Sequence, residues 1–294
     1  MFADFYKEYE RAKELEKEVP EIKGFNKVIF CGVGGSSMPG EIISSLNSII
    51  KIPSFIAREK LPLWVDKQTL CFIISYSGNT KETIELYNKA KKKKAKIIII
   101  TSGGRLSKKP ESKIIIPKGF LPREALPYFL FPVLKIIGIK QDIKKPKITK
   151  KEEQKIQKII NKLSIKDKIP LIYSSSEELK SVSYIWKTQL NENSKTFSHS
   201  NYFPELLHNE IESNFPKNSI PILLKNSKLS YSVSNKIKKI KNLEFLNPIE
   251  ISLKGKNLLD KVIYGIYLGE RISYFVAKNK KVKWKEIPKI KKLK

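Results

Sequence analysis

The sequence predicts an α/β protein with two similar domains, each a mainly parallel sheet flanked by helices. Short apolar runs of strand composition alternate along the chain with segments of helical spacing. The runs are apolar at nearly every position, which is typical of parallel strands covered on both faces. A polar, Lys-rich stretch at 140–151 separates two sets of such units. We therefore expect one domain over 1–143 and a second over 144–294.

In the first half, the run 97–100 consists of isoleucine alone and is too apolar to face water. Two prolines, Pro127 and Pro132, are expected to bend the last helix of this half. The expected elements are a helix at 2–17, strands at 27–32, 54–57, 70–75, 95–101 and 113–117, and helices at 40–50, 81–94 and 121–137.

The second half repeats this plan, but without glycine-rich turns after its strands. Three serines at 174–176 resemble such a turn but lack its glycines. The repetition leads us to expect two similar domains with the ligand between them. The expected elements are helices at 150–163, 177–190 and 258–277 and strands at 169–173, 220–224 and 243–251.

The chain is strongly basic, with 58 Lys and Arg against 29 Asp and Glu and a net charge of +29. Such a charge raises the possibility of nucleic-acid binding. However, only five of the basic residues are arginine, the usual base-reading side chain, and the lysines are spread along the whole chain. Lys-rich genome composition or adaptation to heat explains that spread more simply. We expect no nucleic-acid partner. We do expect the positive electrostatic potential of the chain to attract anionic substrates.

Cysteine content and apolar patterning indicate a soluble cytoplasmic protein. The two cysteines, Cys31 and Cys71, fall inside expected strands, so we interpret them as buried apolar residues and expect neither a disulfide nor a thiolate metal site. No apolar run approaches the roughly 20 residues that cross a bilayer. The acidic amino terminus lacks the pattern of a signal peptide.

A turn rich in hydroxyl groups joins the expected strand at 70–75 to the next helix. Ser75, Ser77 and Thr80 surround Gly78, which can adopt conformations closed to other residues. Hydroxyls and free N–H groups at a helix N-terminus form a site for an anion, and we predict that a phosphate binds there. Turn composition alone also fits ordinary capping without any ligand.

A second turn of the same construction follows the expected strand at 27–32. Here Gly34 and Gly35 allow close backbone approach and Ser36 offers a hydroxyl. Turns at the carboxyl ends of neighbouring parallel strands can face one ligand. The predicted phosphate site consists of Gly34, Gly35, Ser36, Ser75, Ser77 and Thr80.

Together, Gly-x-Gly-Gly-Ser-Ser at 32–37 and Ser-Tyr-Ser-Gly-Asn-Thr-x-Glu-Thr at 75–83 resemble the turns of the phosphosugar-binding sugar isomerase (SIS) domain. Their order most resembles the archaeal bifunctional phosphoglucose/phosphomannose isomerase family, and the resemblance extends from Lys27 to the end of the chain. It implies an aldose–ketose isomerase that interconverts glucose 6-phosphate and fructose 6-phosphate, and also mannose 6-phosphate, through an enediolate. It further implies a homodimer and neither a metal nor a nucleotide cofactor.

The segment from Trp186 to Glu210 resembles the catalytic region of that family. The match implies that Glu192 moves the proton between C1 and C2, a task suited to a partly desolvated carboxylate. In Pro-Glu-Leu-Leu-His-Asn-Glu, His208 matches the histidine that assists ring opening from the partner subunit. His199 has no counterpart, and we interpret it as structural.

Two further positions match residues of the family. Arg123 occupies the position of its active-site arginine, where a guanidinium can stabilise enediolate charge; a surface ion pair with Glu124 is the alternative. Lys294 aligns with a terminal lysine that helps ring opening, although Lys291 and Lys292 are close enough to take that role. Where the family has Pro-Thr, this chain has Trp284-Lys285, so phosphomannose activity is less secure than phosphoglucose activity.

Two other functions also fit the same turns. A related SIS enzyme acting on another phosphosugar would keep the phosphate-binding turns, and a non-catalytic regulator would bind a sugar phosphate without turnover. Fold resemblance does not separate these from the isomerase, because function lies in the site.

Overall fold

The structure, a computed structural model, describes residues 3–139, 143–226, 229, 231–242 and 247–292. The chain forms two compact units, Met1–Ile143 and Lys144–Lys294, and each contains one sheet. All strand pairings among the described residues are parallel. The prediction of an α/β protein with parallel sheets flanked by helices is therefore confirmed.

The sheet of the first unit has the order β2-β1-β3-β4-β5. Every residue of the central strand β3 is buried, as expected for a strand covered on both faces. Phe30 pairs in register with Phe72, and their rings stack with centroids 5.1 Å apart. The strands are β1 Lys27–Cys31, β2 Ser54–Ala57, β3 Thr69–Ile74, β4 Lys96–Thr101 and β5 Ser112–Ile115.

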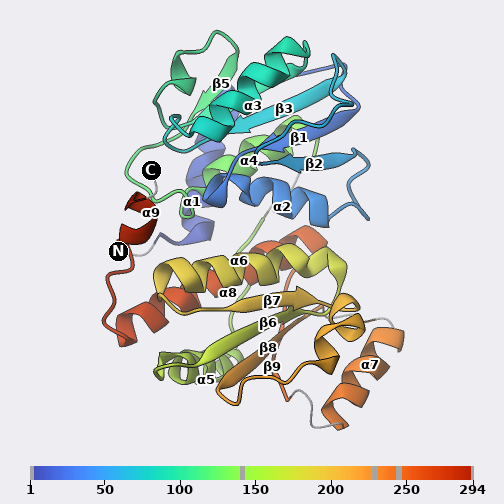
Figure 1. The fold of residues 1–294 in the computed structure, drawn as a ribbon, viewed down its shortest axis with the longest axis vertical. Helices are drawn as coiled ribbons and strands as arrows, with labels where there is room; N and C mark the ends of the chain where they lie inside the picture. The colour runs from blue at the N-terminus through green and yellow to red at the C-terminus, as the bar shows by residue number, and fades with distance from the viewer. Residues whose placement is uncertain (1–2, 140–142, 227–228, 230, 243–246, 293–294) are drawn as a thin grey trace. The chain divides into compact units, whose positions relative to one another are not determined.

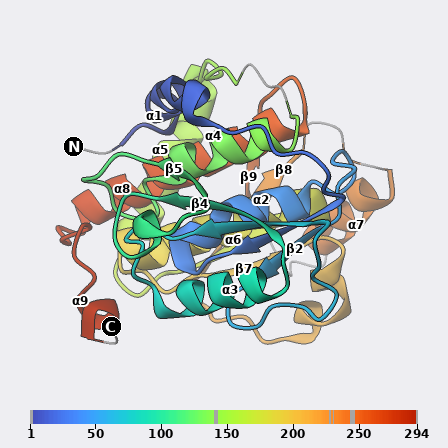
Figure 2. The ribbon, with the colours of Figure 1, turned by 90° about the horizontal axis from the view of Figure 1, so that it is seen from above.

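Helices cover both faces of this sheet (Figures 1 and 2). One face is covered by α3 Lys81–Lys92, whose buried side chains pack on an apolar cluster that includes Cys71. The other face is covered by α2 Met38–Ser45 and α4 Leu126–Ile136, and α1 Phe5–Ala12 packs against α4. Short 3-10 helices lie at Lys13–Glu18, Gly34–Ser37 and Leu106–Lys108.

Two helix boundaries in the first unit differ from expectation in informative ways. The helix expected over 2–17 continues beyond Ala12 only as a 3-10 helix. The helix expected from residue 121 begins at Leu126, with Pro127 in its first turn, where a missing N–H costs nothing. Pro127 therefore starts this helix rather than bending it, and the residues before it form a turn.

The sheet of the second unit has the order β7-β6-β8-β9, with β6 Ile169–Ser174, β7 His199–Tyr202, β8 Ser219–Lys225 and β9 Ile249–Ser252. One face packs against α6 Lys180–Asn193 and α8 Leu258–Asn279, and α5 Lys150–Ser164 contacts α8 (Figure 1). The helices α6 and α8 are joined by a hydrogen bond of 2.7 Å from Trp186 Nε1 to the carbonyl oxygen of Gly265.

The other face of this sheet is covered by α7 Tyr231–Asn242 and by the 3-10 helix Glu205–His208. Their apolar side chains, including Leu206 and Ile237, pack on the strands in one cluster. A 3-10 helix at Glu177–Leu179 precedes α6, another follows at Glu210–Glu212, and α9 spans Pro288–Lys292.

The second unit departs from the predicted elements at several places. Strand β7 and helix α7 were not expected, because their polar sequences lack an apolar pattern. Strand β9 begins only at Ile249; part of the expected strand 243–251 lies outside the described residues. Helix α6 starts later than expected and ends three residues later, at Asn193.

Both cysteines are buried and free, as the sequence predicts. The adjacent Cys71 thiol and burial together raise the pKa of Cys31 well above its ordinary value, so the Cys31 thiol is not a ready nucleophile. Within the described ranges, none of the helices combines the length and apolar character that spanning a bilayer requires.

Candidate functional site

The two predicted phosphate turns follow β1 and β3, and they are in contact. The hydroxyl oxygen of Ser36 accepts a hydrogen bond of 3.2 Å from the backbone N–H of Tyr76. Ser36 is buried in the 3-10 helix Gly34–Ser37, and Gly34 has a φ of +58°. Because β1 and β3 are parallel neighbours, their carboxyl ends bring both turns to one edge of the sheet.

Hydroxyl groups organise the interior of the turn after β3. The Ser75 hydroxyl lies 2.9 Å from that of Thr80 and accepts a hydrogen bond of 3.1 Å from Gly78 N–H. Ser77 is exposed, and its hydroxyl accepts a 3.3 Å hydrogen bond from Asn79 N–H. Thr80 is the N-cap of α3, but its side chain accepts no N–H of the first turn. The helix N-terminus thus combines a positive dipole end with an exposed hydroxyl.

Two glycines allow the turn after β3 to pack closely against the loop after β4. Gly78 has a φ of +65°, and a Cβ there would overlap the carbonyl oxygen of Gly103. Gly104 has a φ of +71°, and a Cβ there would overlap the carbonyl oxygen of Ser77. Ser102 Oγ also donates a 2.7 Å hydrogen bond to the Tyr76 carbonyl oxygen. Sequence reasoning missed this loop, although Ser-Gly-Gly directly after an apolar strand is the same signal as in the first two turns.

The backbone of Arg123 lies against the first phosphate turn. A Cβ on Gly35 would stand 2.7 Å from the Arg123 nitrogen, so only glycine allows this approach. Arg123 is 5 % exposed, which rules out the alternative of a surface residue. The turn before α4 is held by a 2.8 Å hydrogen bond from Leu121 N–H to Glu124 Oε2.

Tyr76 connects the second phosphate turn to the same region. Its hydroxyl donates to the Pro117 carbonyl oxygen at 3.1 Å and accepts from Phe120 N–H at 2.8 Å. The segment 117–123 is therefore fastened to both turns, by Tyr76 at one end and by the backbone contact with Gly35 at the other. The first unit thus gathers the predicted phosphate residues and Arg123 around a single edge of its sheet.

Glu192 lies in the last turn of α6, not after the helix as expected, and is half-buried. Lys195 Nζ donates a 2.6 Å hydrogen bond to the Glu192 carbonyl oxygen, at the negative end of the helix dipole. Asn193 Nδ2 donates a 2.9 Å hydrogen bond to Ser273 Oγ, which fixes the end of α6 to α8. The backbone that carries Glu192 is therefore rigidly held.

His208 ends the 3-10 helix that follows β7, and it is exposed. Within the described residues, no hydrogen-bond or ion-pair partner is seen for its ring. Ser194, just beyond the end of α6, lines a pocket together with Ile169, the first residue of β6. Helix α6 is therefore antiparallel to β6. The end of α6, which carries Glu192, therefore lies near the amino ends of the strands, whereas the 3-10 helix that ends in His208 follows the carboxyl end of β7 (Figure 1). One copy of this unit does not bring the two side chains together.

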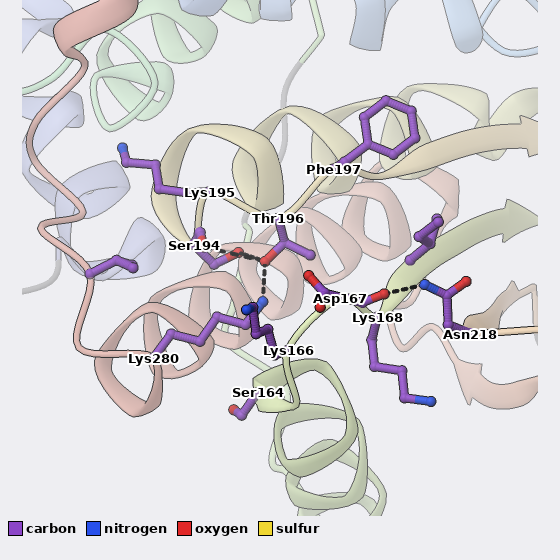
Figure 3. Close-up of a pocket in the computed structure, with 12 residues that line it drawn as sticks. Ser164, Lys166, Asp167, Lys168, Ser194, Lys195, Thr196, Phe197, Asn218 and Lys280 are labelled. Atoms are coloured by element: carbon purple, nitrogen blue, oxygen red, sulfur yellow. Dashed lines mark hydrogen bonds between the residues drawn. The ribbon is translucent and has the colours of Figure 1, made fainter.

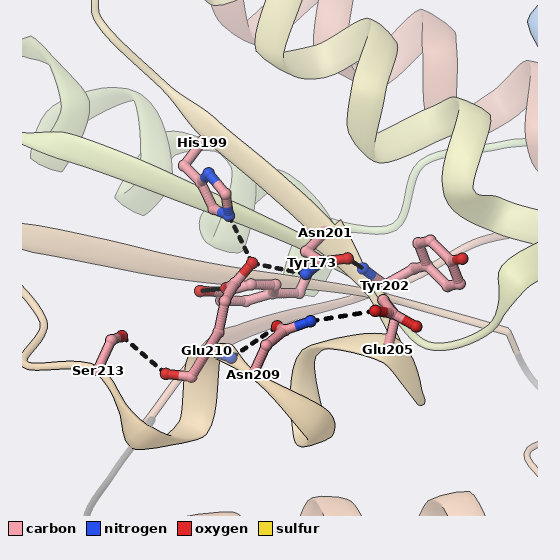
Figure 4. A network of polar contacts seen from close by, with 8 residues as sticks. All are labelled: Tyr173, His199, Asn201, Tyr202, Glu205, Asn209, Glu210 and Ser213. Atoms are coloured by element: carbon pink, nitrogen blue, oxygen red, sulfur yellow. Dashed lines mark hydrogen bonds and ion pairs between the residues drawn. The ribbon is translucent and has the colours of Figure 1, made fainter.

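A half-buried carboxylate, Glu210, lies two residues beyond His208 (Figure 4). It accepts hydrogen bonds from His199 Nε2 at 2.7 Å, Asn201 Nδ2 at 2.6 Å and the Tyr173 hydroxyl at 2.9 Å. Burial alone would raise the pKa of Glu210, but these donors together hold it below its ordinary value. His199 is bound within this network, and its structural role stays a prediction. Sequence reasoning gave Glu210 no role, because its partners are distant in the chain.

A separate pocket of about 750 Å³ lies at the amino ends of the strands in the second unit (Figure 3). Lys280 Nζ reaches into it and donates a 2.9 Å hydrogen bond to Thr196 Oγ1. Burial lowers the pKa of Lys280, and the nearby Asp167 opposes that shift. None of the lining residues is a predicted site residue.

The carboxyl-terminal predictions are only partly described. Lys294 lies outside the described residues, while Lys291 and Lys292 belong to α9. Trp284 packs edge-on against Tyr274, with ring centroids 5.5 Å apart. In the part of the chain that the structure describes, no three His, Cys, Asp or Glu side chains are grouped to hold a metal ion.

Comparison with family models matches both units. Residues 26–119 match the SIS domain, and residues 152–294 match the bacterial phospho-glucose isomerase C-terminal SIS domain. The solved structures that resemble the chain include glucosamine-6-phosphate deaminase from Thermotoga maritima, with a TM-score of 0.68, 17 % identity, and coverage of 97 % of this chain and 95 % of that one. The crystal structure of a putative phosphosugar isomerase from Clostridium difficile gives a TM-score of 0.70 at 16 % identity, with coverage of 99 % of this chain and 95 % of that one. These structures are evidence for the fold.

Curated relatives are closer in sequence. The bifunctional phosphoglucose/phosphomannose isomerase of Thermoplasma volcanium is 33 % identical over 92 % of this chain and 91 % of its own length. The enzyme of the same name from Aquifex aeolicus is 32 % identical over 93 % and 89 %. A D-glucosamine-6-phosphate 4-epimerase from Sulfolobus acidocaldarius is 30 % identical over 82 % of each chain. With its two SIS domains, this chain belongs to the bifunctional phosphoglucose/phosphomannose isomerase family.

Proposed function

We propose that this protein interconverts glucose 6-phosphate and fructose 6-phosphate, and also mannose 6-phosphate and fructose 6-phosphate. Family membership supports this activity. The observation that carries it is the hydrogen bond between Ser36 and Tyr76, because it joins two hydroxyl-bearing turns at one sheet edge, beside the backbone of Arg123. Such an arrangement fits a phosphate held close to the segment that carries Arg123.

In this proposal the substrate phosphate binds at the N-terminus of α3. Ser36, Ser77 and the N–H groups of the first turn of the helix donate to its oxygens. Ser75 and Thr80 support the turn from inside, since their hydroxyls bond to each other. The net charge of +29 attracts the dianion from solution.

The chemical step is a proton transfer between C1 and C2 of the open-chain sugar. Glu192 removes the proton from one carbon and returns it to the other, and Arg123 stabilises the negative charge on the enediolate oxygens. His208, from a partner subunit, and Lys294 assist opening of the ring. The separation of Glu192 and His208 at opposite ends of one sheet supports assembly of the site from two chains of a homodimer.

A coupled assay with fructose 6-phosphate, with and without EDTA, tests this proposal on wild type and Glu192→Gln. We expect turnover that survives chelation and falls by about three orders of magnitude in the variant, because an amide cannot accept the proton. Glu178→Gln, near the start of α6, is the matched control and should retain wild-type rates. Wild-type turnover in Glu192→Gln would contradict the assignment of the base.

The same assay with mannose 6-phosphate tests the epimer range. Lys285 stands where relatives resembling this chain have a threonine implicated in handling the mannose epimer. We expect the mannose-to-glucose activity ratio to rise in Lys285→Thr. An unchanged ratio would remove position 285 from the account of epimer choice.

The similarity to the 4-epimerase favours a second candidate, action on an amino-sugar phosphate. A substrate panel that includes glucosamine 6-phosphate separates the two. Formation of its 4-epimer without turnover of fructose 6-phosphate would replace the proposed activity. Binding of fructose 6-phosphate without any turnover would instead indicate a regulator.

A further inference from the structure

The 3-10 turn that carries His208 is fastened at two points, one apolar and one polar. Leu206, two residues before His208, is fully buried in the cluster under α7. Glu210, two residues after it, has its carboxylate hydrogen-bonded to the sheet. Between these anchors His208 is exposed.

We propose that Glu210 is a positioning residue that holds this turn against β6 and β7, so that His208 is presented in a fixed place for ring opening. The inference rests on the proposed function, since it assigns Glu210 a part in the step given to His208. Glu210 itself does not touch the substrate in this account.

The carboxylate is matched to its surroundings. Oε1 accepts from His199 on β7 and from Asn201 on the same strand, and Oε2 accepts from Tyr173 on β6 (Figure 4). A carboxylate offers only acceptors, which suits three converging donors, whereas an amide would direct its own N–H groups toward one of them. The side chain of Glu210 is 17 % exposed, so water does not readily replace a lost partner.

The two anchors do different things. Leu206 alone fixes one point of the turn, and apolar contacts have little directional preference. Glu210 adds a second point with directional hydrogen bonds to two neighbouring strands, which prevents the turn from rotating about Leu206. The turn is tightened further at Glu210, because Ser213 Oγ donates 2.7 Å to its carbonyl oxygen.

Other roles for Glu210 fit the contacts less well. As a general base it would need a free oxygen and a raised pKa, but both oxygens accept hydrogen bonds and its pKa is lowered. A solvated surface carboxylate would need no particular neighbours, whereas the carboxylate of Glu210 accepts hydrogen bonds from three side chains.

The experiment compares Glu210→Gln with Glu212→Gln, an exposed carboxylate in the same 3-10 helix as Glu210, and with His208→Asn. We measure kcat, KM and the primary isotope effect with glucose 6-phosphate deuterated at C2. If ring opening becomes slow enough to limit the rate, the isotope effect on the proton transfer no longer appears in the measured rate. We therefore expect Glu210→Gln to lower kcat about tenfold or more, to leave KM within about twofold, and to move the isotope effect toward one, as His208→Asn does. Glu212→Gln should match wild type.

Hydrogen exchange of residues 205–212 supplies a readout that does not depend on turnover. We expect faster exchange in Glu210→Gln than in Glu212→Gln, with unchanged protection elsewhere in the second unit. Tyr173→Phe, which removes one of the three donors, should show the same changes to a smaller extent.

Several outcomes would overturn the inference. A lower rate with an unchanged isotope effect would mean only a loss of folded protein, and a larger isotope effect would place Glu210 in the proton transfer. Unaltered exchange at 205–212 would show that Glu210 does not hold the turn. Wild-type protein without isomerase turnover would remove the proposed function and this inference with it, whereas active wild type and unaffected Glu210→Gln would remove this inference alone.

Discussion

The Ser36 hydroxyl and the Tyr76 backbone N–H lie 3.2 Å apart, and this hydrogen bond joins two turns that are 40 residues apart in the chain. Ser36 accepts through its oxygen, so its own proton remains available to donate. One buried side chain can thus align the turn after β3 and contact a bound phosphate.

Ser36→Ala should weaken phosphate binding. A hydrogen bond to a charged group contributes about 1.5–3 kcal/mol, so the KM for fructose 6-phosphate should rise roughly 10- to 150-fold. Steady-state kinetics and a phosphate competition assay measure the effect. Ser44→Ala, which removes a hydroxyl near the C-terminal end of α2 that is hydrogen-bonded to Ser54 on β2, is the control and should leave KM unchanged. Equal KM values in both variants would argue against Ser36 as a phosphate ligand.

Gly78→Ala should destabilise the first unit far more than Gly138→Ala. Both glycines have positive φ, +65° and +77°, so each substitution costs about 1–2 kcal/mol of conformational energy. At Gly138 no heavy atom lies within 4 Å of the added methyl, whereas at Gly78 it meets the Gly103 carbonyl oxygen. We expect a total loss of about 3 kcal/mol or more for Gly78→Ala. Chemical unfolding of both variants checks this, and similar values would show that the loop after β4 adapts freely.

Mixing two inactive variants tests whether Glu192 and His208 act across a dimer. Glu192→Gln and His208→Asn homodimers should each be nearly inactive. After subunit exchange at equal amounts, half of the dimers are mixed and each has one intact site, so we expect about a quarter of wild-type activity. A mixture of Glu192→Gln with Glu192→Ala is the control and should recover none. No recovery in the first mixture would require both residues to act from the same chain.

Glu210 predicts a particular dependence of stability on pH. Its pKa in the folded protein is lowered from 4.5, so the carboxylate stabilises the native state above about pH 4.5, and this contribution is lost as pH falls through the folded pKa. The difference in unfolding free energy between wild type and Glu210→Gln should therefore be largest above that pH and shrink below it. Urea unfolding between pH 7 and pH 3.5 measures the difference. A gap that widens with acid would contradict the lowered pKa.

An element of this fold can be predicted from the sequence when the residues that determine it are close together in the chain. Strands β1, β3 and β4 were predicted to within one residue, because burial on both faces leaves a continuous apolar run that no other element explains. Strand β7, His-Ser-Asn-Tyr, has no such run. It forms by pairing with β6 and through the contacts of its polar side chains with Glu210, and both depend on residues distant in the chain.

The same distinction applies to the site. The turns with Ser36 and Ser75 could be predicted, because glycine and hydroxyl residues after an apolar strand are a local signal. The role of Glu210 could not, since His199, Asn201 and Tyr173 converge on it only in the folded chain. The loop with Gly103 and Gly104 carried a readable signal that was not used.

The close backbone contacts of Gly78 and Gly104 have a thermodynamic consequence for any anion that binds at the start of α3. The turn is already ordered by folding, because backbone N–H groups of Ser102 and Leu106 in the loop after β4 donate hydrogen bonds to the carbonyl oxygens of Tyr76 and Gly78 without a ligand. The entropy of arranging the donor groups is therefore spent before the ligand arrives. Association there should show a small heat-capacity change and a rate limited by diffusion and charge rather than by loop closure.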